Sequence, residues 1–166
     1  MRNPVKHSRY GVIAFILLGL CTVLPGCGHQ YVKGTKIDYS EEKQELADLV
    51  ERYRRAVEQR DVETLRAMTS LNYYENGSTT TNPNDDYDYN GLEKVFSELK
   101  NTVRTVKYNI KITDIRILGD TARVDFEYRS QYLFGAGEQD RWETAADKNR
   151  LQFRKEQDGW RILSGM

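Results

Sequence analysis

Residues 106–128, VKYNIKITDIRILGDTARVDFEY, carry apolar side chains at every second position, which is the period of a β-strand with one buried face. The alternation changes parity between Ile112 and Ile115, so we expect a β-bulge near residues 113–114. The Gly-Asp pair at 119–120 predicts a turn into a second strand. The stretch therefore predicts an antiparallel hairpin that covers one side of a core.

Two more strands are expected toward the C-terminus. A Gly-Ala-Gly turn at 135–137 leads into a long third strand over residues 142–153. An Asp-Gly pair at 158–159 is a strong hairpin signal, and residues 160–163 return as the last strand. Together with the first hairpin they predict a four-stranded antiparallel sheet.

Helical spacing replaces strand alternation in the part of the chain before the sheet. Residues 41–58 have one apolar stripe on an otherwise charged helix, made of Leu46, Leu49, Val50, Tyr53 and Val57. Asp61 is placed to cap a second, shorter helix that ends near Met68. Residues 91–103 again read as a helix, after a polar run over 72–90 that predicts a loop.

This order of elements, with the motifs 59-QRDVETL-65 and 158-DGWRI-162, resembles the nuclear transport factor 2-like superfamily, which includes SnoaL-like and ketosteroid isomerase-like domains. The similarity covers residues 41–166. It implies an α+β fold in which a curved antiparallel sheet wraps around a long N-terminal helix as a cone with a pocket at its open end, a cystatin-like arrangement. Members of the superfamily include isomerases, dehydratases, epoxide hydrolases and proteins without catalysis, so the resemblance alone implies no single activity.

The N-terminus resembles a bacterial lipoprotein signal. Arg2, Lys6 and Arg9 precede an apolar segment over residues 10–24, and Leu-Pro-Gly-Cys follows, ending at Cys27. We expect cleavage after residue 26, acylation of Cys27, and a flexible tether over 27–40 before a domain over 41–166. Cys21 is the weaker candidate because bulky Leu20 precedes it, and an uncleaved signal anchor is the remaining alternative.

Cleavage would leave 140 residues with 22 Lys and Arg against 25 Asp and Glu. This mildly acidic balance argues against binding of nucleic acid, whose phosphates require a basic face. One histidine, His29, and no free cysteine would remain, which excludes Cys-His and Ser-His-Asp catalysis and multi-histidine metal sites. No cofactor is expected.

Aromatic side chains on the concave side of the expected sheet are the candidate ligand pocket, since they suit an apolar or planar ligand. The candidates are Tyr53, Tyr108, Phe126, Tyr128, Tyr132, Trp142 and Trp160. An ordinary filled core is the alternative. No catalytic residue is assigned, because Asp125 and Glu127 occupy the polar, solvent-facing parity of their strand.

Residues 86–91, DYDYNG, match the first half of a calcium-binding EF-hand loop, with Asp86, Asp88 and Asn90 at alternate positions. The twelfth position is Ser97, where that loop needs a bidentate glutamate. These residues are therefore only a weak calcium candidate.

The leading interpretation is a non-catalytic envelope lipoprotein whose domain binds a small apolar ligand or a protein partner. The alternatives are a cofactor-free isomerase or hydrolase of the ketosteroid isomerase type, and a structural or assembly component of an envelope complex. A homodimer through the sheet is a further expectation. Gly28, in place of a retaining aspartate, favours the periplasmic face of the outer membrane in a Gram-negative source.

Overall fold

The computed structural model describes residues 29–77, 86–136 and 139–166. Cys27 and the apolar N-terminal segment lie outside these ranges, so the lipoprotein assignment stays a prediction. Within the described part of the chain, no helix has both the length and the apolar character needed to cross a membrane.

Three helices form where the sequence predicts them. Helix α1 (Glu41–Gln59) begins at Ser40, whose hydroxyl accepts the amide N–H of Lys43 at 3.2 Å. It ends at Arg60, the one non-glycine residue with a left-handed φ among the described residues. Helix α2 (Val62–Met68) is capped by Asp61, and helix α3 (Tyr89–Asn101) starts earlier than expected and runs into the sheet.

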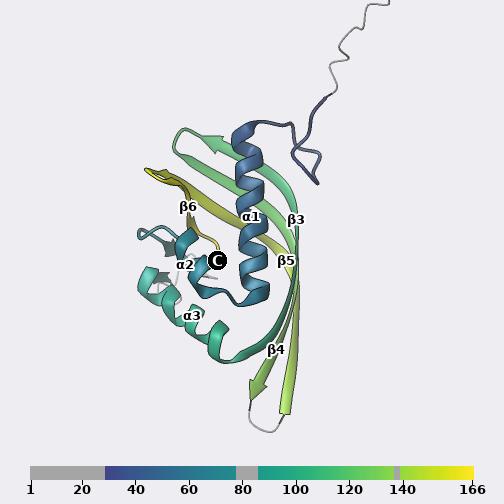
Figure 1. Ribbon diagram of the computed structural model, residues 1–166, viewed down its shortest axis with the longest axis vertical. Helices are drawn as coiled ribbons and strands as arrows, with labels where there is room; N and C mark the ends of the chain where they lie inside the picture. Colours follow the sequence, from purple (N-terminus) through teal and green to yellow (C-terminus); the bar gives the residue numbers. More distant parts are fainter. Residues whose placement is uncertain (1–28, 78–85, 137–138) are drawn as a thin grey trace, which may run out of the picture.

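The main sheet has four antiparallel strands in the order β3-β4-β5-β6. They are β3 (Val103–Leu118), β4 (Thr121–Ala136), β5 (Gln139–Glu156) and β6 (Gly159–Ser164). The expected bulge is present as a register shift between Ile112 and Asp114. Figure 1 shows the sheet curving around α1, with α2 and α3 on the same concave side, while the far ends of β4 and β5 extend beyond the helices. The predicted α+β cone is confirmed.

The core lies between α1 and the concave face of the sheet. Leu46 and Val50 of α1, Val124 of β4 and Leu151 of β5 are all at most 1% exposed. The two helix residues belong to the apolar stripe of α1, and the two strand residues belong to the apolar set of alternate positions. Burial therefore follows the periodicity of the sequence.

The polar run that the sequence predicts as a loop contains a small second sheet. Strands β1 (Tyr74–Glu75) and β2 (Tyr87–Asp88) pair antiparallel. Tyr73, just before β1, is 2% exposed and stacks on Tyr87 with ring centroids 6.1 Å apart. This segment is therefore anchored to the core at both of its ends.

Residues 29–40 do not behave as the flexible tether that the sequence predicts. Val32 is fully buried in the core, and Tyr31 forms an isolated antiparallel bridge with Asp38. The amide of Lys33 donates to the side chain of Gln44 in α1 at 2.9 Å. A single buried valine has no periodicity, which is why the pattern along the chain gives no sign of this packing.

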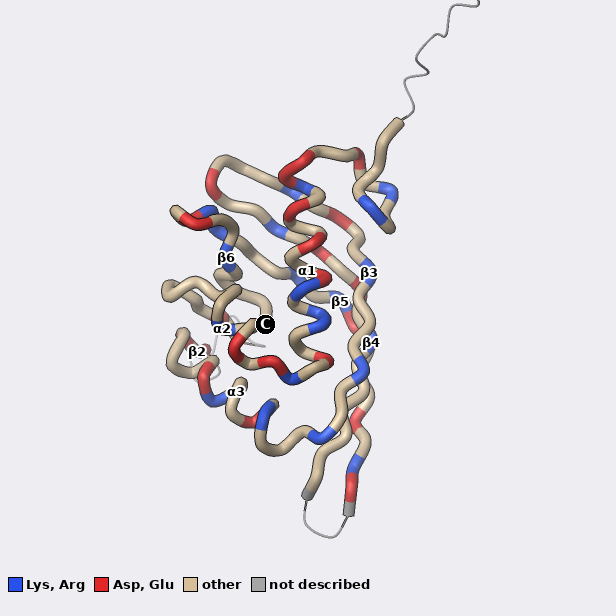
Figure 2. The backbone as a smooth tube through the Cα atoms, viewed as in Figure 1, with Lys and Arg blue, Asp and Glu red and all other residues tan. Residues whose placement is uncertain are grey.

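Acidic and basic residues are interspersed along α1 and along the strands of the sheet (Figure 2). Asp125 is paired with Arg150 of β5, and Glu127 with Lys111 of β3 at 3.3 Å. The prediction that these two carboxylates belong to a solvated outer face is confirmed, and neither is available as a pocket base.

Candidate functional site

The candidate site is an apolar cavity of about 420 Å³ between α1, α3 and the part of β4 and β5 nearest their connection. It falls within the size range of small-molecule sites. The lining residues are Tyr53, Val57, Leu65, Leu92, Val95, Phe96, Glu98, Leu99, Val103, Ser130, Tyr132, Phe134, Glu143, Thr144, Ala145 and Met166. Most are aliphatic or aromatic, so the cavity favours an apolar occupant.

A cluster of tyrosines from three elements lies at the cavity and directly beside it. Tyr53 of α1 meets the edge of Tyr108 of β3 with ring centroids 6.0 Å apart, and Tyr108 lies 5.8 Å from Tyr128 of β4. Tyr132, four residues after Tyr128 and on the same face of β4, lines the cavity directly. Burial raises the pKa of Tyr53, Tyr108 and Tyr132, so these phenols remain neutral across the physiological range and can donate hydrogen bonds.

Only part of the predicted pocket set lines the cavity. Tyr53 and Tyr132 do so, while Tyr108 and Phe126 are buried beside it in the core and Tyr128 is half-buried between them. For these three residues the alternative of ordinary core packing fits better than direct contact with a ligand.

The prediction that Trp142 faces the pocket is wrong. Trp142 pairs with Leu133, whereas the cavity-lining Tyr132 pairs with Glu143, so Trp142 points to the convex face. It is 52% exposed there, with the ammonium of Lys107 5.8 Å from the centre of its ring. Trp160 also lies away from the cavity: it is 4% exposed and packs in the core at the start of β6.

Three kinds of lining residue were missed by sequence reasoning. The apolar stripe of α3, which includes Leu92 and Phe96, was recognised as a buried face but not as a cavity wall. Ser130 follows the inward parity of β4 and could have been found from that parity. Met166 reaches the cavity through the path of the chain after β6, for which the sequence gives no signal.

The carboxylates of the cavity lie at its rim. Glu98 and Glu143 are both exposed, and Glu143 is paired with Arg141. A base of the ketosteroid isomerase type needs a carboxylate in an apolar setting that disfavours its charge. Among the residues that line this cavity, none is a buried carboxylate, so the arrangement suits binding better than proton transfer.

Both carboxylate oxygens of Asp88 and one of Asp86 in the weak calcium candidate are engaged within the protein, while Oδ1 of Asp86 is buried with no hydrogen-bond partner in the described part of the chain. Asp86 accepts the hydroxyl of Tyr74 at 2.6 Å, and Asp88 caps α3 by accepting the amide of Gly91 at 3.0 Å. Asn90 lies inside the helix and donates to Asp88. In the described ranges, no group of three His, Cys, Asp or Glu residues could hold a metal ion.

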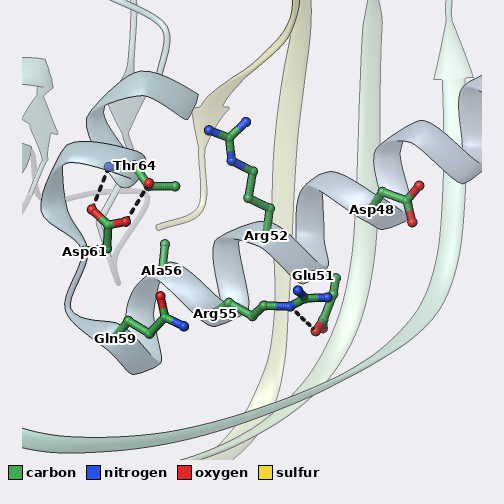
Figure 3. Close-up of a pocket in the computed structure, with 8 residues that line it drawn as sticks. All are labelled: Asp48, Glu51, Arg52, Arg55, Ala56, Gln59, Asp61 and Thr64. Carbon is green, nitrogen blue, oxygen red and sulfur yellow. Dashed lines mark hydrogen bonds and ion pairs between the residues drawn. The ribbon is translucent and has the colours of Figure 1, made fainter.

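A second hollow, of about 510 Å³, lies on the outward side of α1 and at its corner with α2 (Figure 3). Its charges already serve local structure: Glu51 pairs with Arg55 at 2.8 Å, and Asp61 accepts both the amide and the hydroxyl of Thr64. This groove is the solvated face of an amphipathic helix, with a helix cap at its end.

Residues 42–164 match the sequence profile of the calcium/calmodulin dependent protein kinase II association domain. The chain belongs to this family. The association-domain match covers all of the helices and strands described above except the first residue of α1, so the shared feature is the complete cone. A search of curated proteins finds no match.

Solved structures similar to this association-domain chain confirm the nuclear transport factor 2-like fold. A conserved protein from Planctomyces limnophilus aligns with a TM-score of 0.64 at 12% identity, over 75% of this chain and 92% of its own. A nuclear transport factor 2-like protein from Salmonella enterica gives 0.60 at 15%, over 74% and 87% of the two chains. A proposed scytalone dehydratase from Novosphingobium aromaticivorans gives 0.63 at 12%, over 75% and 80%. Identities this low support the fold alone.

Proposed function

We propose that this protein is a non-catalytic, lipid-anchored envelope protein whose cavity binds a small apolar ligand. The observation that carries the proposal is the cavity itself, which combines walls from α1, α3 and the sheet with carboxylates only at its exposed rim. Pockets of this kind gain affinity from the apolar surface they remove from water.

The polar groups of the cavity define the ligand further. Tyr53 and Tyr132 bring phenols and Ser130 brings a hydroxyl to otherwise apolar walls. Neutral phenols donate hydrogen bonds to carbonyl or ether oxygens. The expected ligand is therefore an apolar, planar molecule with one or two acceptor oxygens.

Ligand binding is tested by thermal unfolding and by an apolar fluorescent probe, over a panel of aromatic, sterol-like and fatty compounds. Intrinsic tryptophan emission is a poor readout, because neither Trp142 nor Trp160 lines the cavity. At least one compound should raise the melting temperature and displace the probe. A panel without any response would contradict the ligand proposal.

Assembly with a protein partner is the second candidate function. It is supported by the association-domain family to which the chain belongs and by the exposed Trp142 on the convex face. An enzyme of the ketosteroid isomerase type is supported less well, because the cavity lacks a buried carboxylate among its lining residues.

Anchoring is tested separately from ligand binding. Because acylation requires the Cys27 thiol, Cys27→Ser should abolish lipid labelling and leave unprocessed precursor, while Cys21→Ser should leave both unchanged. Fractionation of a Gram-negative source should place the labelled protein in the outer membrane. Labelling that persists in Cys27→Ser would contradict the anchor.

A further inference from the structure

The outer edges of the sheet are covered by other parts of the chain. At the β3 edge, Glu58 of α1 accepts the amide of Tyr108 at 2.9 Å and Arg54 donates to its carbonyl at 3.1 Å. At the β6 edge, the amide of Ser70 donates to the carbonyl of Ile162 at 2.9 Å. Such cover prevents a strand edge from pairing with another chain.

The groups that cover the β5 edge differ along its length. Strand β6 pairs only with residues 152–156 of β5, and Gly165 lies against the carbonyl of Arg150. Before that point the amides of Arg150 and Lys148 face no partner strand. They donate instead to the side-chain oxygens of Asn149 and Asp147, both at 2.7 Å. The edge is therefore closed by side chains down to residue 147.

Residues 140–146 continue the same edge, and their side chains are exposed on both faces. Hydrogen-bonding directions alternate along a strand, and the β4–β5 register has no shift, so the amides of 142, 144 and 146 point away from β4 as that of 148 does. This segment has the free N–H and C=O groups of an open strand.

The sequence of the open segment is complementary to itself. An antiparallel pair of two copies must place outward-pointing positions opposite each other, so residue 144 can lie opposite residue 144 of the second copy. That register puts Arg141 opposite Asp147, and Asp140 opposite Lys148. It also puts the large Trp142 opposite the small Ala146. A register centred on residue 143 or on residue 145 does not place Arg141 opposite Asp147. The register centred on 145 also places the two acidic residues Glu143 and Asp147 opposite each other.

We propose that two copies of this chain pair antiparallel through β5, centred on Thr144, to form one continuous eight-stranded sheet. Arg141 exchanges its contact with Glu143 for Asp147 of the second copy, and Asp147 releases the amide of Lys148. Glu143 and Ala145 line the cavity, so pairing brings the rims of two cavities together. The pairing goes beyond ligand binding and does not depend on it.

A charge exchange tests this register. The mass of the full chain, solubilised in detergent, is followed by sedimentation over a range of concentrations. Arg141→Asp or Asp147→Arg alone turns two symmetry-related attractions into repulsions, so each should weaken dimerisation roughly tenfold or more. The double variant should restore the dimer, because the two positions lie six residues apart on one extended strand and can meet only between copies.

Lys111→Asp is the matched control, since it reverses a charge on the convex face of β3, at the opposite side of the sheet from the open segment of β5. It should leave the dimer unchanged, and circular dichroism should show all variants folded. A wild-type chain that stays monomeric would overturn the proposal. So would a dimer that is unaffected by the single reversals, or a double variant as weak as either single one.

Discussion

The carboxylate of Glu58 in α1 accepts the backbone N–H of Tyr108 in β3 at 2.9 Å. Its other oxygen accepts from Arg54, which also donates to the carbonyl of Tyr108. Two helix side chains thus take the place of a fifth strand along the β3 edge. This contact fixes how α1 lies across the sheet, and so positions the tyrosine cluster at the cavity.

Glu58→Ala should therefore destabilise the fold. It leaves the Tyr108 amide without its acceptor and removes a partner of Arg54, which should lower the free energy of unfolding by about 1–3 kcal/mol. Glu63→Ala is the control, because Glu63 pairs with Arg66 and Lys100 at the surface and should cost less than about 1 kcal/mol. Denaturant unfolding measures both, and equal losses would contradict the role given to Glu58.

The packing of residues 29–40 predicts that this segment contributes to stability. Val32→Ala removes buried methyl groups from the core and should cost about 1–3 kcal/mol. A protein that begins at residue 38 should be destabilised at least as much. Tyr39→Ala, at a 41% exposed position, is the control and should be nearly neutral. A truncated protein as stable as the full domain would restore the interpretation of a free tether.

The sequence predicts most of the fold because its strands and helices each follow one clear period. The parity change at the bulge, the Asp61 cap and the stripe of α1 all have a local cause and all appear in the structure. The prediction that Trp142 faces the pocket is wrong because this alternation was not applied to it. Its facing could have been read from the alternation within β5: Trp142 lies nine residues before the buried Leu151, and an odd separation on a strand without a bulge between them places the two side chains on opposite faces.

The cavity was harder to predict than the sheet. Its tyrosines lie on the expected concave parity, but whether they line a space or fill it depends on how far α3 stands from β4 and β5. Val32 and Met166 show the same limit, since each packs through long-range contacts that leave no pattern in the neighbouring residues.

Stability should depend on acid pH through Glu51. The two-pronged contact with Arg54 lowers the pKa of Glu51 to about 2, and burial opposes this shift only in part. A lowered pKa stabilises the fold above the ordinary value of 4.5, and this contribution is lost as the pH falls from there toward 2. Since the side chain is 43% exposed, solvent screening limits the effect to about 1 kcal/mol.

Unfolding measured between pH 6 and pH 2.5 checks this dependence. In Glu51→Gln, the free energy of unfolding should fall less steeply with decreasing pH (the acid limb of the curve) than in the wild type. Asp48→Asn is the control, because Asp48 accepts the neutral amide of Gln44 at 2.9 Å and should leave the limb as steep as before. An unchanged acid limb in Glu51→Gln would show that other carboxylates account for it.

The most direct test of the account is binding of an apolar probe to the cavity before and after its mouth is filled. Val95 lines the cavity and is 42% exposed, so Val95→Trp can fill the opening without displacing the core. Leu71→Trp, at an 80% exposed position outside the cavity, is the control. We predict that the wild type and Leu71→Trp bind an anilinonaphthalene probe equally, while Val95→Trp weakens binding roughly tenfold or more with its melting temperature unchanged. Equal probe binding by all three proteins would contradict the cavity as the ligand site.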